Sequence, residues 1–177
     1  MGWSLDYQSP REPELLDQFF LSVGKALYLA SAFESKCQWV LRIVKIAAHF
    51  QRSSDASATA ELAKAMKDKL LGPTLNELKG FPEFTAADVA KLERAKDARN
   101  FIAHESTEIG SLSSATAKVI CERIGRLRTE LSALASGDNL VSAWVYEISE
   151  KEPPPRGIQS EYPEWVSQWV FGDDNGT

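Results

Sequence analysis

The six residues from Arg99 to His104, Arg-Asn-Phe-Ile-Ala-His, combine side chains that can bind a phosphate and move a proton. Histidine gains and loses a proton near neutral pH, and the arginine guanidinium is a fork of N–H donors that fits phosphate oxygens. Asn100 precedes His104 by four residues, so on a helix its amide lies one turn away and could orient the imidazole. This spacing makes Arg99, Asn100 and His104 candidate catalytic residues for acid–base chemistry on a phosphate ester.

The surroundings of Arg99 and His104 leave other interpretations open. No acidic residue lies three or four positions from Arg99, so the guanidinium has no ion-pair partner on its own helix. It could instead pair with a carboxylate of another helix, such as Glu34, and His104 could be a cation near a helix C-terminus. Five residues turn a helix by about 500°, so Arg99 and His104 point about 140° apart. Two copies of the helix, facing each other across a dimer axis, could aim both side chains at one substrate.

The composition is that of an ordinary single globular domain. The chain has 177 residues, of which 44% are hydrophobic and 25% are charged, and no apolar run approaches the roughly 20 residues of a membrane span. The N-terminus shows no basic and apolar leader, so we expect a cytoplasmic protein that does not bind membranes. The net charge of −5 restricts nucleic-acid binding to a local basic patch.

The cysteines and histidines do not form a metal-binding pattern. Two of each are present, without a CxxC or HExxH spacing, so we expect neither a metal ion nor a cofactor. Cys37 and Cys121 lie among helix-periodic apolar residues, which predicts two buried free thiols in a reducing compartment.

Apolar residues recur at three- and four-residue steps along most of the chain. From Glu12 to His49 this pattern predicts helix, with Gly24 marking either a kink or a close approach of another helix. Further helices are predicted at residues 58–71, stopped by Gly72-Pro73; at 86–105, capped by Thr85; and at 114–136, stopped by Gly137-Asp138. Residues 139–150 fit either a helix or a strand, and we prefer a helix because the neighbouring segments are helical.

These elements predict an all-α fold, a helical bundle of about five helices with a short C-terminal helical appendage. We expect an N-terminal arm at residues 1–11 and one helical domain at residues 12–150. Residues 151–177 are expected to form a Pro-rich linker, a short helix at 163–171 and a disordered tail.

The run Arg99-Asn100-x-x-x-His104, late in one helix and followed by a turn and another long helix, resembles the HEPN superfamily. The segment from Gly24 to Lys36 also looks like the first long helix of such domains, and the resemblance covers about residues 12–150. It implies a homodimer in which two copies of the motif meet in one cleft. Many members are metal-independent endoribonucleases of toxin–antitoxin, abortive-infection or other defence systems, while others bind RNA or a protein partner without cutting.

Under this resemblance His104 would be the general base or acid, Arg99 would stabilise the phosphate, and Asn100 would orient the other groups. Lys96 and Arg94, on the same helix, could bind the RNA backbone, although acidic neighbours make mixed solvated faces an equal alternative. An antitoxin or another protein regulator is an expected partner. Members paired with small nucleotidyltransferase antitoxins carry a Tyr two residues after the His, where this chain has Ser106, so we do not expect that form of regulation.

Overall fold

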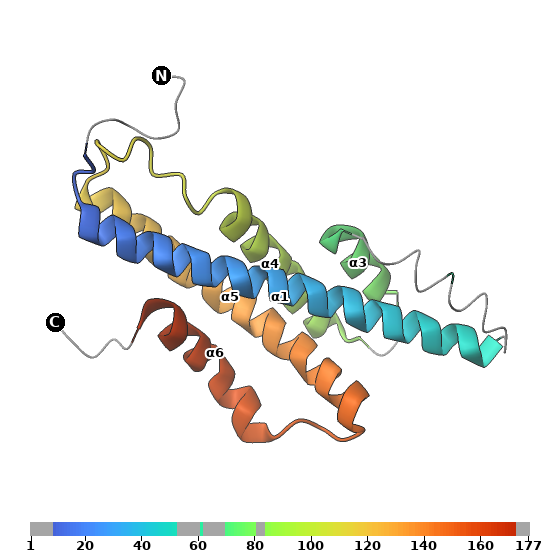
Figure 1. Ribbon diagram of the computed structural model, residues 1–177. Coiled ribbons are helices and arrows are strands. Elements are labelled where there is room, and N and C mark those ends of the chain that lie inside the picture. The colour runs from blue at the N-terminus through green and yellow to red at the C-terminus, as the bar shows by residue number, and fades with distance from the viewer. Residues whose placement is uncertain (1–8, 53–60, 62–69, 81–83, 173–177) are drawn as a thin grey trace.

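The computed structural model describes residues 9–52, 61, 70–80 and 84–172, and every regular element in these ranges is a helix. The helices are α1 (Pro13–Arg52), α3 (Leu71–Leu78), α4 (Ala86–His104), α5 (Ala117–Glu150) and α6 (Arg156–Phe171) (Figure 1). This confirms the prediction of an all-α bundle of about five helices with a short C-terminal helix.

Helix α5 makes the most extensive packing contacts, with α1, α4 and α6, and α1 contacts all four other described helices. The three- and four-residue apolar steps of the helix predicted at 114–136 form a seam on α5, where Ile120, Leu127, Leu131 and Leu134 are buried and Ile124 is partly buried. The facing residues of α1 follow the same three- and four-residue steps, and they form the other half of the core: Leu16, Phe19, Val23, Ala26, Ala30, Phe33, Cys37 and Val40. No helix in the described ranges is long and apolar enough to cross a membrane.

The start of α4 agrees with the sequence. The Thr85 hydroxyl accepts a hydrogen bond from the Asp88 backbone N–H, and the Asp88 carboxylate accepts one from the Thr85 N–H at 3.1 Å. This reciprocal capping satisfies two N–H groups that have no partner inside the helix. The cap fixes the residue at which α4 begins.

The predicted stop at Gly137-Asp138 is wrong, because α5 continues through both residues to Glu150. A Cβ atom on Gly137 would lie 2.3 Å from the Cβ of Ala95, so this glycine allows α4 to approach closely. Asp138 is buried and forms an ion pair with Lys36 of α1. Both residues serve helix packing rather than helix termination, and the preference for a helix at 139–150 is confirmed.

Two helix boundaries that were predicted from prolines, at Pro73 and Pro163, also differ from the prediction. Gly72 and Pro73 lie in the first turn of α3, where a proline is tolerated because its missing N–H has no partner there. Helix α6 begins at Arg156 and contains Pro163. Pro163 cannot donate to the Gln159 carbonyl four residues before it, and the Asn139 side chain of α5 donates to that carbonyl instead, at 2.7 Å. The rest of the helix predicted before Gly72 lies largely outside the described residues.

Helix α6 is attached to the bundle by both apolar and polar contacts. Val166 and Val170 are buried in the common core. The Ser22 hydroxyl of α1 donates to the Val170 carbonyl at 3.2 Å, and the Lys25 ammonium donates to the Trp169 carbonyl at 2.7 Å. The C-terminal helix is therefore part of the same packed unit as α1 and α5. The expected arm and tail lie mostly outside the described residues.

Both cysteines are free, but only Cys37 is buried. Burial and the nearby carboxylate of Asp138 raise the pKa of the Cys37 thiol far above its ordinary value. The expectation of burial is wrong for Cys121, which lies on the exposed side of α5 beside the buried Ile120.

Candidate functional site

The last two turns of α4 place the three candidate catalytic residues. Phe101 and Ile102 are buried, so the side of α4 that carries Asn100 and His104 faces outward and both residues are exposed. The guanidinium of Arg126 from α5 lies over the Phe101 ring at 4.2 Å from its centroid. This stacking anchors the end of α4, and with it the motif.

Arg99 is paired with Glu34, the alternative that the sequence left open. Its Nη2 lies 2.6 Å from Oε2 of Glu34 on α1, and the two side chains are 24% and 17% exposed. Its Nη1 donates to Oδ1 of Asn100 at 3.3 Å. Among the described residues these contacts use two of the five N–H donors of the guanidinium, which is held in place but not enclosed.

The structure brings Arg99 and Asn100 together, but it does not form the expected contact between Asn100 and His104. The Asn100 amide oxygen is turned toward Arg99. His104 is the last residue of α4, and its side chain makes no hydrogen bond within the described part of the chain. The imidazole is therefore open to solvent at the helix end.

The buried residue Ser106 caps the C-terminal end of α4. Its hydroxyl donates to the Ile102 carbonyl at 2.7 Å, its backbone N–H donates to the Phe101 carbonyl at 2.9 Å, and the residue is 2% exposed. Arg123 of α5 covers the next carbonyls, donating to that of Glu105 at 3.3 Å and also to that of Glu108. The serine thus terminates the helix, and its hydroxyl does not face the surface.

The two candidate RNA-binding residues lie on different sides of α4. Arg94 pairs with Glu130 of α5 at 2.7 Å, and this hydrogen-bonded carboxylate raises the pKa of the guanidinium. Lys96 pairs with Glu93 one turn earlier and lies 3.9 Å from Asp97. A phosphate would have to compete with a carboxylate at either position. No cluster of three metal-ligating side chains occurs among residues 9–52, 61, 70–80 and 84–172.

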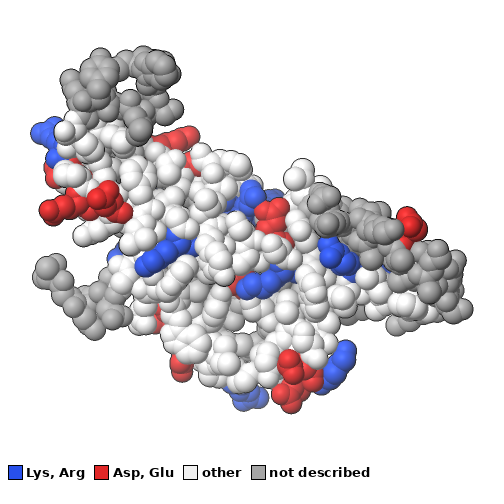
Figure 2. Space-filling model, viewed as in Figure 1, with Lys and Arg blue, Asp and Glu red and all other residues white. Residues whose placement is uncertain are grey.

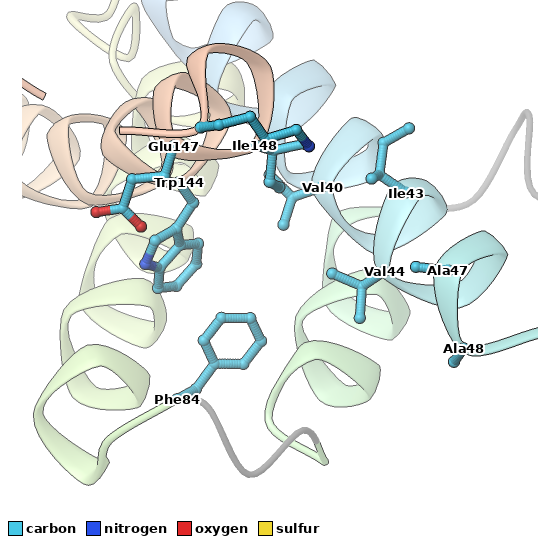
Figure 3. Close-up of a pocket in the computed structure, with 10 residues that line it drawn as sticks. Val40, Ile43, Val44, Ala47, Ala48, Phe84, Trp144, Glu147 and Ile148 are labelled. Carbon is cyan, nitrogen blue, oxygen red and sulfur yellow. The ribbon is translucent and has the colours of Figure 1, made fainter. Parts of the chain in front are cut away.

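A second feature, which the sequence did not reveal, is an apolar hollow of about 480 Å³ at the far end of the bundle. Its walls come from α1 and α5, and Phe84 lies across it, with its ring centroid 4.4 Å from that of Trp144 (Figure 3). Phe84 precedes α4 and His104 ends it, so the hollow and the motif are separated by the length of α4, about 27 Å. They are separate sites.

A third feature is a buried polar cluster that joins α1, α5 and α6. The Lys36 ammonium lies 2.8 Å from Oδ1 of Asp138 and donates to the Ser142 hydroxyl at 2.8 Å, while the Tyr162 hydroxyl donates to Asp138. Burial and the hydrogen bond with Asp138 raise the pKa of Tyr162. No sequence pattern indicates this cluster, because Asp138 beside Gly137 has the pattern of a helix cap.

Comparison of this chain with family models, with curated proteins and with solved structures gives no match.

Proposed function

We propose that this chain is a metal-independent endoribonuclease of HEPN type that works as a homodimer. The observation that carries the proposal is the arrangement at the end of α4. The last two turns of α4 carry an open imidazole, His104, and an exposed amide, Asn100, which accepts a hydrogen bond from a guanidinium, Arg99, that a carboxylate already orients. The resemblance of the motif to the HEPN superfamily supports the same reading.

In this proposal the 2′-hydroxyl of the RNA attacks the adjacent phosphorus. One histidine takes the proton from that hydroxyl, the P–O5′ bond breaks, and a second histidine gives a proton to the leaving 5′-oxygen. The products are a 2′,3′-cyclic phosphate and a 5′-hydroxyl. Each chain supplies one His104, so two chains provide both the base and the acid. General acid–base catalysis of this kind is worth about 10²–10⁴ in rate.

Arg99 would stabilise the charge that accumulates on the phosphate in the transition state. Glu34 holds the guanidinium in one orientation and also lowers its attraction for a phosphate, because a negative charge is already beside it. The resemblance extends the proposal to a toxin or phage-defence role in the cytoplasm, under the control of a protein antitoxin or another regulator.

A second candidate is a non-catalytic HEPN-like dimer that binds RNA or a protein partner. The ion pairs favour it, since Arg99, Arg94 and Lys96 all contact carboxylates. A structural role for these pairs would leave little free positive charge for catalysis.

The deciding experiment is a cleavage assay on labelled RNA in EDTA, with the fragment ends identified. Wild type and Asp97→Ala, a matched control at an exposed position of α4, should give cyclic phosphate ends. Arg99→Ala and His104→Ala should each lose at least about a hundredfold in rate. Equal activity in all four proteins would mean a contaminating nuclease and a wrong site. RNA binding without cleavage of any RNA tested would favour the second candidate.

A further inference from the structure

From Gln18 to Ser35 the exposed residues of α1 are uncharged and mostly apolar, whereas Asp17, one turn before Leu21, is an exposed charge on the same side of the helix. We call the uncharged stretch the outer face of α1 and define it by the residues that lie on this side of the helix: Phe20, Leu21, Gly24, Leu27, Tyr28, Ser31 and Ser35. All seven are exposed, with Leu21 at 61% and Tyr28 at 67%. In Figure 2, which has the same view as Figure 1, acidic groups lie near the start of α1, and the surface farther along this part of the helix is mostly white.

A helix side that faces water usually carries charged residues. Between Gln18 and Phe33 the only charged residue is Lys25. Lys25 lies at the edge of the outer face, where its ammonium donates to the Trp169 carbonyl and lies 5.6 Å from the centre of the Trp169 ring. The charge is therefore turned toward α6 and away from the outer face.

Gly24 is an independent sign that another helix approaches this face. Glycine is unfavourable in the middle of a helix, and α1 continues through Gly24 without a break. A Cβ atom at this position would have no neighbour within 4 Å in the described part of the chain. The described part of the single chain gives no reason for a glycine here, whereas a second helix backbone packed against it would.

The apolar surface continues onto α6. Tyr28 makes an edge-to-face contact with Trp169, with ring centroids 6.0 Å apart, and Trp165 and Trp169 are both nearly half exposed. Six of the ten large hydrophobic side chains that are exposed in the described residues belong to this region: Phe20, Leu21, Leu27, Tyr28, Trp165 and Trp169. Such a gathering is typical of an interaction surface.

We propose that the outer face of α1 is the surface through which two copies of this chain associate, with the two α1 helices crossing at Gly24. A two-fold axis places each patch against its own copy, so any charge on it would meet a like charge near the axis. A face without charges suits this partner. It does not suit RNA or an anionic membrane, which both require exposed cations.

The position of Arg99 connects this surface with the proposed function, on which the inference rests for its purpose. Glu34 follows Phe20 and Leu27 at seven-residue spacing, so the three residues lie along the same side of α1. The ion pair of Glu34 with Arg99 therefore borders the outer face. A second copy bound there places a second pair of Glu34 with Arg99 beside the same interface, which a shared active site requires.

Sedimentation equilibrium of wild type, Leu21→Glu, Tyr28→Glu and the control Val119→Glu tests the surface. Val119 is an exposed apolar residue of α5, outside the outer face. Wild type and Val119→Glu should be dimers, and the two α1 variants should associate at least about a hundredfold more weakly, because each would bury two unpaired carboxylates per dimer. Circular dichroism should show all four to be equally helical.

A crosslink tests the crossing point. Gly24→Cys in a Cys121→Ser background should form a disulfide-linked dimer on mild oxidation, because the axis would bring the two Cα atoms within bonding range. Ser35→Cys in the same background lies three turns away and should crosslink much less. Equal crosslinking at both positions would overturn the proposed crossing.

The failure of this inference is distinguishable from the failure of the proposed function. A monomeric wild type, a dimer unaffected by Leu21→Glu, or binding to anionic vesicles in place of self-association would overturn the surface, whatever the RNA assay shows. A wild-type dimer that Leu21→Glu separates would support the surface even if no RNA is cleaved, and in that case only the nuclease proposal fails.

Discussion

Two ion pairs leave α1 two residues apart and differ in almost every respect. Lys36 reaches Asp138 of α5, whose side chain is 2% exposed, and Tyr162 and Ser142 complete the hydrogen bonds of the pair. Glu34 reaches Arg99 of α4, and both side chains keep contact with water. Two residues turn a helix by about 200°, so the pairs lie on nearly opposite flanks of α1.

The contrast separates a structural pair from one that can exchange partners. The Asp138 carboxylate is enclosed by three helices, and releasing it would expose a buried charge. The Arg99 guanidinium is partly exposed and keeps unused N–H donors among the described residues, so in the proposed function a phosphate would replace or join its carboxylate partner. Of these two ion pairs, the buried one therefore suits a structural role, and the partly exposed one suits the ligand-binding role proposed for Arg99.

The distinction between the two ion pairs requires that the pair of Lys36 with Asp138 stabilises the fold. Replacing Asp138 by alanine should cost about 3 kcal/mol of unfolding free energy, because Lys36 and Tyr162 lose their common partner inside the protein. Asp138→Asn keeps the shape and should cost less. Urea unfolding measures both. A loss below about 1 kcal/mol for the alanine variant would class this pair with ordinary surface pairs.

The close packing of α4 against Gly137 should contribute nearly as much to the unfolding free energy as the Asp138 pair does. Gly137→Ala places a methyl group against Ala95 and should cost about 2 kcal/mol, since α4 and α5 must move apart. Gly125 is the matched control on the same helix, because its added methyl group would have no neighbour within 4 Å in the described residues. Gly125→Ala should gain about 0.5–1 kcal/mol. Equal thermal shifts for the two variants would contradict the close approach.

The buried cluster should also make the protein sensitive to alkali. The folded state raises the pKa of both Cys37 and Tyr162, so above their ordinary values of 9.0 and 10.0 only the unfolded chain loses these protons. Stability should therefore fall as the pH rises, by about 1.4 kcal/mol per pH unit for each of the two groups above its ordinary pKa. Tyr162→Phe should give a shallower decline in unfolding free energy between pH 9 and 11. Parallel curves would mean that Tyr162 does not contribute.

The smallest effect on stability is expected at the exposed pair. Glu34→Gln should change the unfolding free energy by less than about 1 kcal/mol, because water already screens the interaction. It should lower the KM for RNA by about threefold to tenfold, since a negative charge beside Arg99 is removed. Asp97→Asn removes an exposed carboxylate of α4 and serves as the control. A lower kcat at unchanged KM would instead make Glu34 a positioning residue.

Local chemistry predicted much of the fold. The seam on α5 and the cap at Thr85 depend on residues close together in sequence, and both were found where expected. The boundaries at Gly137 and Pro163 were mispredicted because their explanations come from other helices: α4 packs against Gly137, and Asn139 supplies the hydrogen bond that Pro163 cannot. Sequence patterns do not show which distant helix will compensate for a helix breaker.

The candidate site was predictable as a set of residues but not as a set of contacts. The sequence showed that Arg99 lacks a partner on its own helix, and it offered Glu34 only as one example of a partner from elsewhere. The choice depends on the register between α1 and α4, which no local pattern specifies. For the same reason the hydrogen bond from Arg99 to Asn100 replaced the expected contact between Asn100 and His104.

The length of α1 has a consequence for folding during synthesis on the ribosome. Its 40 residues are synthesised before the helices that pack against them, which end at residues 78, 104, 150 and 171. At about 5–20 residues per second, a ribosome needs about 5–20 s after Arg52 to finish α5. During that time the residues of α1 that face α5 lack this partner, although α3 and α4 are made earlier. Apolar surface that waits in this way on a growing chain is prone to aggregate, which is the condition that chaperones relieve.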